Sequence, residues 1–316
     1  MRGSLMRVDA HAHVMTQAYI DAVPAPGGNL PKPPVVTAEA LLAMMDRFAI
    51  DAAVISTGPP GAFFGDQGRA NEIARLANEE IASAVSASRA RFAGLVLLPL
   101  PDVEAALAEL AHGLDAMGLE GVLLLSNVAG TYLGHPAWEP LYAELDRRGA
   151  YVFLHPTVPA NGVPLPHPAW LYEFPFDTTR ALANLIYSGT FERYPNIRWQ
   201  VSHLGGATTI LADRIASLAA REPDKAAAAP AGAVEYLSRL YYDTGLANHE
   251  LPYRATAMLT AADRIVFGTD WPYLVLPDEP GDPAPGLGFL EDGERAALDA
   301  ANIGALVPRF ASGRPS

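Results

Sequence analysis

The 316-residue chain is half hydrophobic and has a net charge of −13, so it can bury a sizeable core, while its acidity argues against non-specific binding to nucleic acid. Cysteine is absent, which excludes disulfides and thiolate metal sites, so any bound metal must be held by histidine and carboxylate side chains. No apolar run is long enough to span a bilayer and no signal-peptide segment precedes the first motif, so we expect a cytoplasmic protein without a membrane partner.

Eight short apolar segments are expected to form buried strands. In chain order they cover residues 5–13, 52–56, 92–98, 121–125, 151–155, 197–202, 240–243 and 264–268. Helical periodicity is found between them, at residues 37–48, 67–88, 103–117, 138–148, 177–186 and 210–218. Thr37 is expected to cap the first of these helices. The alanine-rich connector 225–233 is assigned to a loop and a helix inside the domain, because the strand count is incomplete there.

Strands that alternate with helices, without hairpin turn signals, predict a parallel sheet with helical crossovers. Eight such units close into a barrel, so we expect an α/β fold, a (β/α)8 TIM barrel with residues 1–316 in a single domain. Long loops on its C-terminal face, at 24–34 and 156–175, are candidate active-site loops. A doubly wound open sheet is the alternative. It would require Gly-x-Gly-x-x-Gly after the first strand, where this chain has His-x-His.

Four of the eight histidines are expected at the C-terminal ends of strands. His11 and His13 end the first strand, His155 the fifth and His203 the sixth, while Asp270 follows the eighth. Residues i and i+2 of a strand point to the same side, so His11 and His13 can bind one ion together.

Taken singly, each of these histidines would be a hydrogen-bonded strand-end residue, and Asp270 would be a helix N-cap. In a TIM barrel, however, the C-terminal strand ends meet at the active site. Three imidazoles and a carboxylate suit Zn²⁺ or Mn²⁺, with a position left for water or substrate. The combination therefore predicts a metal site.

Four motifs resemble those of the amidohydrolase superfamily. They are Asp9-x-His11-x-His13, His155-Pro156, Ser202-His203-Leu204-Gly205-Gly206 and Phe267-Gly268-Thr269-Asp270-Trp271-Pro272. Over nearly the whole chain, the resemblance is to the decarboxylase branch typified by aminocarboxymuconate-semialdehyde decarboxylase. Further stretches resemble the 6-methylsalicylate decarboxylase group, namely residues 59–61, 98–102, 145–148 and 173–180.

This resemblance implies a metal-dependent, non-oxidative decarboxylase of a small aromatic carboxylic acid such as a salicylate analogue. It implies one divalent ion, with Zn²⁺ favoured and Mn²⁺ as the alternative, held by His11, His13, His155 and Asp270. His203 would stand beside the ion as a catalytic acid or base, and Asp270 would also take part in catalysis.

Loss of CO₂ from such an acid would leave a carbanion at an sp² carbon, and two routes avoid it. In the favoured route Asp270 protonates the ring carbon before CO₂ leaves, while the metal anchors the substrate. In the other, water activated by His203 adds to the substrate before the C–C bond breaks. The alternative function is a metal-dependent hydrolase of a lactone or amide that uses metal-bound water. A non-enzymatic binding module would need no such set of residues.

The resemblance also bears on the number of metal ions. Binuclear members of the superfamily bridge two metals with a carboxylated lysine at the end of the fourth strand. Here that strand ends Leu125-Ser126-Asn127, and the only lysines, Lys32 and Lys225, are not near it, so we expect a single ion. The related dihydroxybenzoate decarboxylases have glutamate where this chain has His11, which favours the aminocarboxymuconate or methylsalicylate side.

For substrate binding, the resemblance places Arg214 in the active site of a neighbouring subunit, where it would hold a substrate carboxylate. A homodimer or higher homo-oligomer is therefore expected, and a solvated helix arginine is the alternative. Trp170 and Trp271, with Phe174, are candidates for an aromatic wall. Asp243 ends the seventh strand, and whether it hydrogen-bonds to the site stays open.

The aminocarboxymuconate enzyme carries a further carboxylate-binding arginine in the loop after its first strand. This chain has no arginine between Arg7 and Arg47. The absence favours a monocarboxylate over a dicarboxylate as the substrate.

Overall fold

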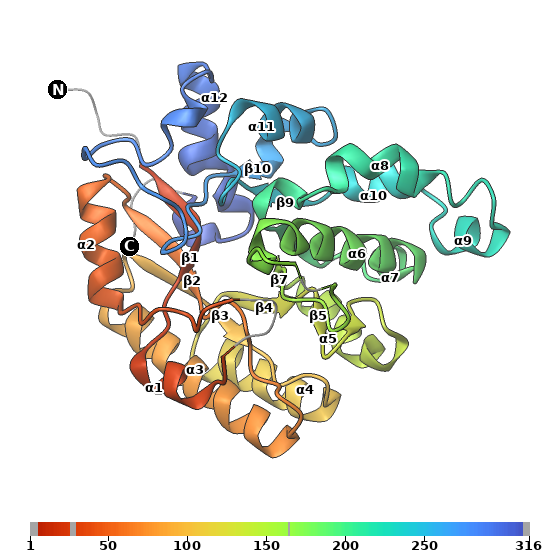
Figure 1. The fold of residues 1–316 in the computed structure, drawn as a ribbon, viewed down its shortest axis with the longest axis horizontal. Coiled ribbons are helices and arrows are strands. Elements are labelled where there is room, and N and C mark those ends of the chain that lie inside the picture. The colour runs from red at the N-terminus through yellow and green to blue at the C-terminus, as the bar shows by residue number, and fades with distance from the viewer. Residues whose placement is uncertain (1–5, 26–29, 164, 312–316) are drawn as a thin grey trace.

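Eight parallel strands form the barrel expected from the sequence (Figure 1). The computed structural model describes residues 6–25, 30–163 and 165–311, so Leu5, which the sequence assigns to the first strand, lies outside the described residues. The barrel order is β1 (Val8–His13), β2 (Ala52–Ser56), β3 (Phe92–Leu97), β4 (Gly121–Leu125), β7 (Tyr151–His155), β8 (Arg198–Val201), β9 (Tyr241–Asp243) and β10 (Ile265–Val266). Each of the eight predicted strands is confirmed.

The barrel closes between β1 and the segment that follows β10. The Ala10 amide donates to the Phe267 carbonyl (2.8 Å), and the Asp270 amide donates to the His11 carbonyl (2.7 Å). An isolated parallel bridge between residues 12 and 271 continues this pairing. Closure therefore brings Asp270 beside His11 from the other end of the chain.

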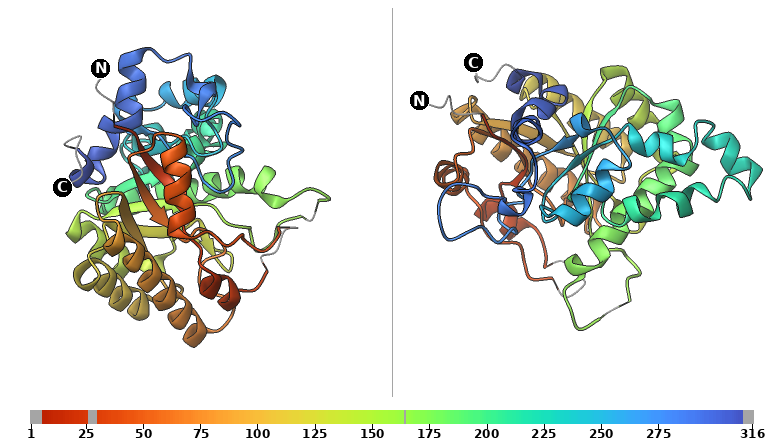
Figure 2. Two further views of the ribbon diagram at one scale, coloured as in Figure 1. Left: turned by 90° about the vertical axis from the view of Figure 1, so that its left-hand side faces the viewer. Right: turned by 90° about the horizontal axis from the view of Figure 1, so that it is seen from above.

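Helices cover the outside of the barrel (Figures 1 and 2). They are α1 (Gln17–Ala22), α2 (Ala38–Arg47), α3 (Gln67–Ala87), α4 (Val103–Ala111), α5 (Glu139–Arg148), α6 (Glu173–Tyr187), α7 (Thr190–Arg193), α8 (Thr208–Ala216), α9 (Pro223–Ala228), α10 (Ala233–Ser238), α11 (Glu250–Ala257) and α12 (Asp292–Ala296). The Thr37 cap is confirmed, because its side chain accepts a hydrogen bond from the Ala40 amide (3.2 Å). In the described part of the chain, no helix combines the length and apolar character needed to cross a membrane.

A short antiparallel hairpin, β5 (Asn127–Val128) and β6 (Thr131–Tyr132), corrects the expectation that no hairpin joins two strands. Its two-residue turn has positive φ at both Ala129 (49°) and Gly130 (85°), as a type I′ turn requires. The usual signal for this turn is Asn-Gly or Asp-Gly, so Ala-Gly did not indicate it. The hairpin forms a separate sheet and leaves the barrel topology unchanged.

The bounds of α4 and α6 differ most from those predicted. Helix α4 ends at Ala111 and continues as a π-helical turn, where a Cβ added to Gly113 would lie 2.4 Å from Val96 Cγ2 of β3. Helix α6 begins at Glu173, four residues before the predicted start. Pro175 does not prevent this early start, because it lies in the first turn of the helix, where proline is tolerated.

Alternate strand residues face the barrel interior and the surrounding helices. In β3, Leu95 and Leu97 belong to one buried cluster, whereas Val96 belongs to the other, which also contains Leu110 of α4. Phe153 of β7 lies below the strand ends, and its ring centroid is 4.7 Å from that of His11. The polar strand ends therefore rest on an apolar interior at the C-terminal end of the barrel.

Candidate metal centre

The four expected ligands lie together at the C-terminal end of the barrel. His11 and His13 end β1, His155 ends β7, and Asp270 follows β10. One ligand atom from each lies within 4.8 Å of the others, and all four residues are buried. Asp270 Oδ1 lies 3.1 Å from His11 Nε2 and 3.0 Å from His13 Nε2. In the described ranges, this is the one such group of histidine and acidic side chains.

His11 and His155 each use Nδ1 for a hydrogen bond within the protein, so Nε2 is the ring atom of each that can face a cation. His11 Nδ1 donates to Asp243 Oδ1 (3.0 Å), and His155 Nδ1 donates to the Pro156 carbonyl (2.8 Å). His155 Nε2 is buried and has no hydrogen-bond partner among the described residues. Because an unpaired buried polar atom is costly, a cation at this place would stabilise the arrangement. The set of three imidazoles and one carboxylate fits one divalent metal ion.

The charges at the centre also favour a cation. Burial alone would lower the pKa of His11, but the carboxylates of Asp243 and Asp270 outweigh burial and raise that pKa to about 10. Burial would raise the pKa of Asp270, yet His11 and the other neighbouring histidines hold it well below its usual range. Burial moves the pKa of His155 well below its usual value, so this imidazole stays neutral and available as a ligand.

His203 lies beside the four-residue group and not within it. Its ring centroid is 5.3 Å from that of His11 and 5.4 Å from that of His155, and its Nε2 lies 3.0 Å from Asp270 Oδ2. His203 and Asp270 both have a left-handed backbone, with φ of 56° and 57°, which is uncommon for residues other than glycine. No helix begins directly after Asp270 in the described residues, so it is not a helix N-cap. Strained backbone of this kind clusters at functional sites.

Asp243, whose role the sequence left open, holds both neighbouring histidines. Its Oδ1 accepts hydrogen bonds from His11 Nδ1 (3.0 Å), the His203 amide (3.1 Å) and the Gly245 amide (3.0 Å). Its Oδ2 accepts one from Gln200 Nε2 (2.7 Å). Sequence reasoning missed Gln200, and the signal for it was a lone amide side chain inside an apolar strand.

We expect Asp243→Asn to weaken metal binding by about 10- to 100-fold, because the imidazole of His11 loses the carboxylate that fixes its orientation and tautomer. Asp263→Asn, an exchange of the same kind at an exposed position, serves as the matched control. Metal titration of both metal-free variants measures the effect. Equal affinities would contradict the orienting role.

Asp9 ties β1 to the segment that carries Asp270. Its Oδ1 accepts hydrogen bonds from the amides of His11 and Thr269 (2.9 Å each), and its Oδ2 accepts one from the Thr269 hydroxyl. Burial raises the pKa of Asp9 to about 6, although these hydrogen bonds oppose the rise. The first residue of the Asp-x-His-x-His motif thus fixes the relative position of two candidate ligands.

A cavity of about 750 Å³ opens in front of the centre, with His155 and Asp270 in its wall. Its remaining wall comes from the loops that follow the strands, and most of these residues are apolar. Lys32 is the lining residue that carries a permanent positive charge. The volume lies within the range of small-ligand sites.

The expected aromatic wall is present in part. Trp170 and Phe174 line the cavity, but Trp271 does not and packs instead against the buried core. Sequence reasoning missed Tyr273, which lines the cavity with its ring centroid 6.0 Å from that of His13. The signal that could have found it is an aromatic residue three positions after the strand-end aspartate.

Arg214 does not contact this site within one chain. It lies on α8, is exposed, and is absent from the cavity wall. At the end of β4 the chain offers Leu125 and Ser126 and no lysine, which agrees with a single ion.

Known proteins resemble this chain in sequence and in fold. The 6-methylsalicylic acid decarboxylase of Aspergillus aculeatus is 31% identical over 84% of each chain. The 2-amino-3-carboxymuconate-6-semialdehyde decarboxylase of Dictyostelium discoideum is 31% identical over 72% of this chain and 65% of its own length. A dihydroxybenzoic acid decarboxylase from Polaromonas sp. JS666, solved with manganese and the inhibitor 2-nitroresorcinol, superposes with a TM-score of 0.80 at 23% identity, covering 96% of this chain and 97% of that one.

A family model described as amidohydrolase matches residues 8–307, which span the whole barrel from β1 to the C-terminal turns. The matched range contains the four candidate ligands, His203 and Asp243. The chain therefore belongs to the amidohydrolase family.

Proposed function

We propose that this protein is a metal-dependent, non-oxidative decarboxylase of a small aromatic carboxylic acid such as a salicylate analogue. The observation that carries the proposal is the convergence of three imidazoles and the Asp270 carboxylate at the wall of a 750 Å³ cavity, with His203 beside them. The names of two similar proteins, a 6-methylsalicylic acid decarboxylase and a dihydroxybenzoic acid decarboxylase, support aromatic acids as the substrate class.

For the metal we favour zinc, with manganese as the alternative. The proposed ligands are His11, His13, His155 and Asp270, a set that suits both ions. The Polaromonas structure contains manganese, which supports the alternative. When bound, the ion would hold the substrate carboxylate and a neighbouring oxygen and withdraw negative charge from them. Elemental analysis of the purified protein distinguishes the two.

The proton for the reaction is proposed to pass along the pair formed by His203 and Asp270. His203 Nε2 lies 3.0 Å from Asp270 Oδ2, so a proton on His203 can pass to this carboxylate. Asp270 would then deliver it to the ring carbon that bears the carboxylate. The bond from that carbon to the carboxylate breaks, its electron pair returns to the ring, and CO₂ leaves.

We also propose a homodimer or higher homo-oligomer in which Arg214 of one subunit holds the substrate carboxylate in its partner, while Trp170 contacts the aromatic ring. Arg214 is exposed, and Ile210, one helical turn before it, is 74% exposed as well, so this face of α8 is open to a second subunit. Trp271 is not retained as a substrate contact, because it packs against the core. A cytoplasmic location is part of this proposal, and cell fractionation would check it.

Mixing two inactive variants tests whether Arg214 acts in the partner. In a mixed dimer of Arg214→Ala and His11→Ala subunits, one site combines intact ligands with an intact arginine from its partner. At random exchange half of the dimers are mixed, and each mixed dimer has one active site of two. We therefore expect an equal mixture to regain up to about a quarter of the wild-type activity, whereas each variant alone stays inactive. No recovery, despite mixed dimers seen by native mass spectrometry, would contradict the role in the partner.

The proposed reaction is tested by CO₂ release from salicylate and 6-methylsalicylate with metal-loaded protein. A decarboxylase releases one CO₂ per substrate consumed, and in D₂O its product carries one deuterium at the former carboxylate carbon. Turnover of a lactone or amide with uptake of water, and without CO₂ from any aromatic acid, would overturn the proposal in favour of a hydrolase.

A further inference from the structure

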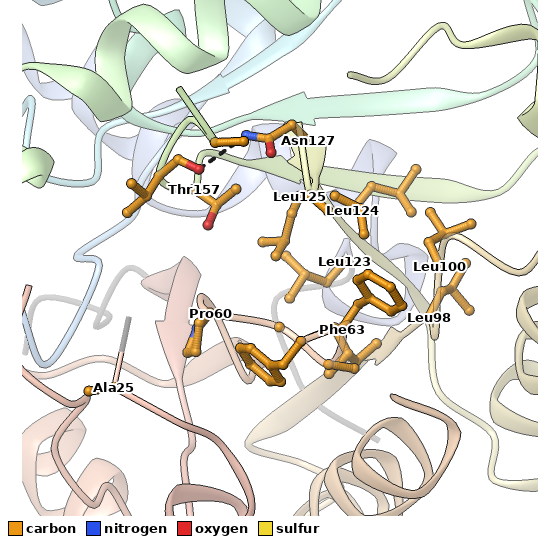
Figure 3. A pocket seen from close by; sticks show the side chains of 18 residues that line it. Ala25, Pro60, Phe63, Leu98, Leu100, Leu123, Leu124, Leu125, Asn127 and Thr157 are labelled. Atoms are coloured by element: carbon orange, nitrogen blue, oxygen red, sulfur yellow. Dashed lines mark hydrogen bonds between the residues drawn. The ribbon is translucent and has the colours of Figure 1, made fainter. Parts of the chain in front are cut away.

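A second cavity, of about 200 Å³, lies beside the large one at the same end of the barrel. It is bounded by the ends of β3 and β4, the loop after β2, the hairpin of β5 and β6, and the loop after β7. Figure 3 shows Leu123 and Leu125 of β4 on one side and Pro60 and Phe63 on the other. We call this cavity the side chamber.

The side chamber is lined mainly by apolar side chains. None of its described lining residues is charged, and the polar side chains among them are Asn127 and Thr157. Asn127 Nδ2 donates to Asp177 Oδ2 (2.8 Å) and to the Val158 carbonyl (3.4 Å), and its Oδ1 accepts from the Gly130 amide (3.0 Å). Because this amide is already satisfied, the chamber favours an apolar ligand over a polar one.

Its size is that of a small hydrocarbon group. An apolar cavity of roughly 150 Å³ lined by leucine, isoleucine and phenylalanine binds benzene, so 200 Å³ can hold a chain of about three to six carbons. Gly61 keeps the loop after β2 against this wall, since a Cβ at that position (φ 84°) would lie 2.7 Å from Leu125 Cδ1. The positive φ and this close approach both favour glycine at this position.

The side chamber meets the large cavity close to the metal centre. Pro60, Thr157 and Val158 line both cavities. Thr157 follows the candidate ligand His155 by two residues, a span of at most about 7 Å along the chain. A group attached to a ring bound at the centre can thus enter the chamber through this boundary.

We propose that the side chamber is a subsite for an apolar ring substituent, so that the preferred substrate is an aromatic acid with an alkyl or alkenyl chain longer than methyl. This inference rests on the proposed decarboxylase function and specifies its substrate class. The aromatic ring occupies the large cavity, and its chain lies between Leu125 and the Pro60–Phe63 loop.

The test compares salicylates whose 6-position carries hydrogen, methyl, propyl or pentyl. Burial of each methylene is worth about a fourfold gain in kcat/KM, so the series should rise with chain length until the chamber is full. In Leu125→Phe, which fills the chamber, the ratio of pentyl to unsubstituted substrate should fall by at least about tenfold, whereas Leu125→Ala should extend the rise to longer chains. Leu251→Phe, a matched exchange at an 81% exposed position that lines neither cavity, should keep the wild-type ratio.

A second measurement separates this inference from the proposed function. Binding of propylbenzene, followed by ligand-observed NMR, requires no turnover and should be lost in Leu125→Phe but kept in Leu251→Phe. If no salicylate releases CO₂ while this pattern of binding holds, the proposed function fails and the apolar subsite stands. A flat series in the wild type, or propylbenzene binding that Leu125→Phe leaves unchanged, would overturn the subsite.

Discussion

Replacement of His11 by alanine is expected to abolish metal binding and turnover while the barrel still folds. His11 supplies one of four converging ligand atoms, so its loss should weaken metal binding by more than the roughly 100-fold that follows loss of an outer hydrogen bond. Asp243 Oδ1 keeps the amides of His203 and Gly245 as donors. The lost hydrogen bond should therefore cost about 1–3 kcal/mol of stability. Elemental analysis and thermal unfolding measure the two effects.

His249→Ala is the matched control for this variant. His249 lines the same cavity but is exposed and lies outside the ligand group, so its removal should leave metal content unchanged. His155→Ala provides a second test, because His155 supplies another of the four ligand atoms and its Nε2 has no hydrogen-bond partner in the described residues. A folded His11→Ala protein with one equivalent of metal would contradict the assignment of His11 as a ligand.

His203→Asn is expected to retain the metal and lose about 10²- to 10⁴-fold in kcat, the usual contribution of a positioned acid or base. His203 lies beside the ligand group and hydrogen-bonds to Asp270 Oδ2, so its removal takes away the proposed proton source but no ligand. Asparagine is preferable to alanine here, because the backbone at this position has φ of 56° and asparagine adopts that region more readily.

His167→Asn supplies the corresponding control, since His167 is exposed and lies outside the described cavity wall. We expect it to keep both metal and turnover. Metal content by elemental analysis and CO₂ release per second separate the two roles. Loss of the metal in His203→Asn would make His203 a ligand, and unchanged turnover would remove it from the proton pathway.

The sequence by itself determined the architecture and most of the centre. Strand positions follow from short apolar runs and helix positions from a periodicity of 3.6 residues, and both are local properties of the chain. Because parallel strands of a barrel end on one face, His11, His13 and His155 could be grouped without coordinates. Asp270, which follows the eighth strand, was grouped with them on the same ground, and the family resemblance separated His203 from the ligands.

Only the tertiary structure decided which side chains support that centre. Asp243 hydrogen-bonds to His11 across 232 positions of sequence, and no local pattern relates the two residues. Trp271 follows Asp270 directly, yet it packs against the core, while Tyr273 turns its ring toward His13. The direction in which each of these side chains points depends on the conformation of the backbone in the loop that carries it.

The physical reason is that these arrangements come from packing between distant elements. Hydrogen bonds across the closing strands accompany φ of 57° at Asp270, a left-handed conformation that is uncommon for residues with a side chain. The side chamber likewise exists because the loop after β2 lies against Leu125 of β4. Local propensities determine the strands and helices, whereas the shape of the cavities follows from how their side chains pack.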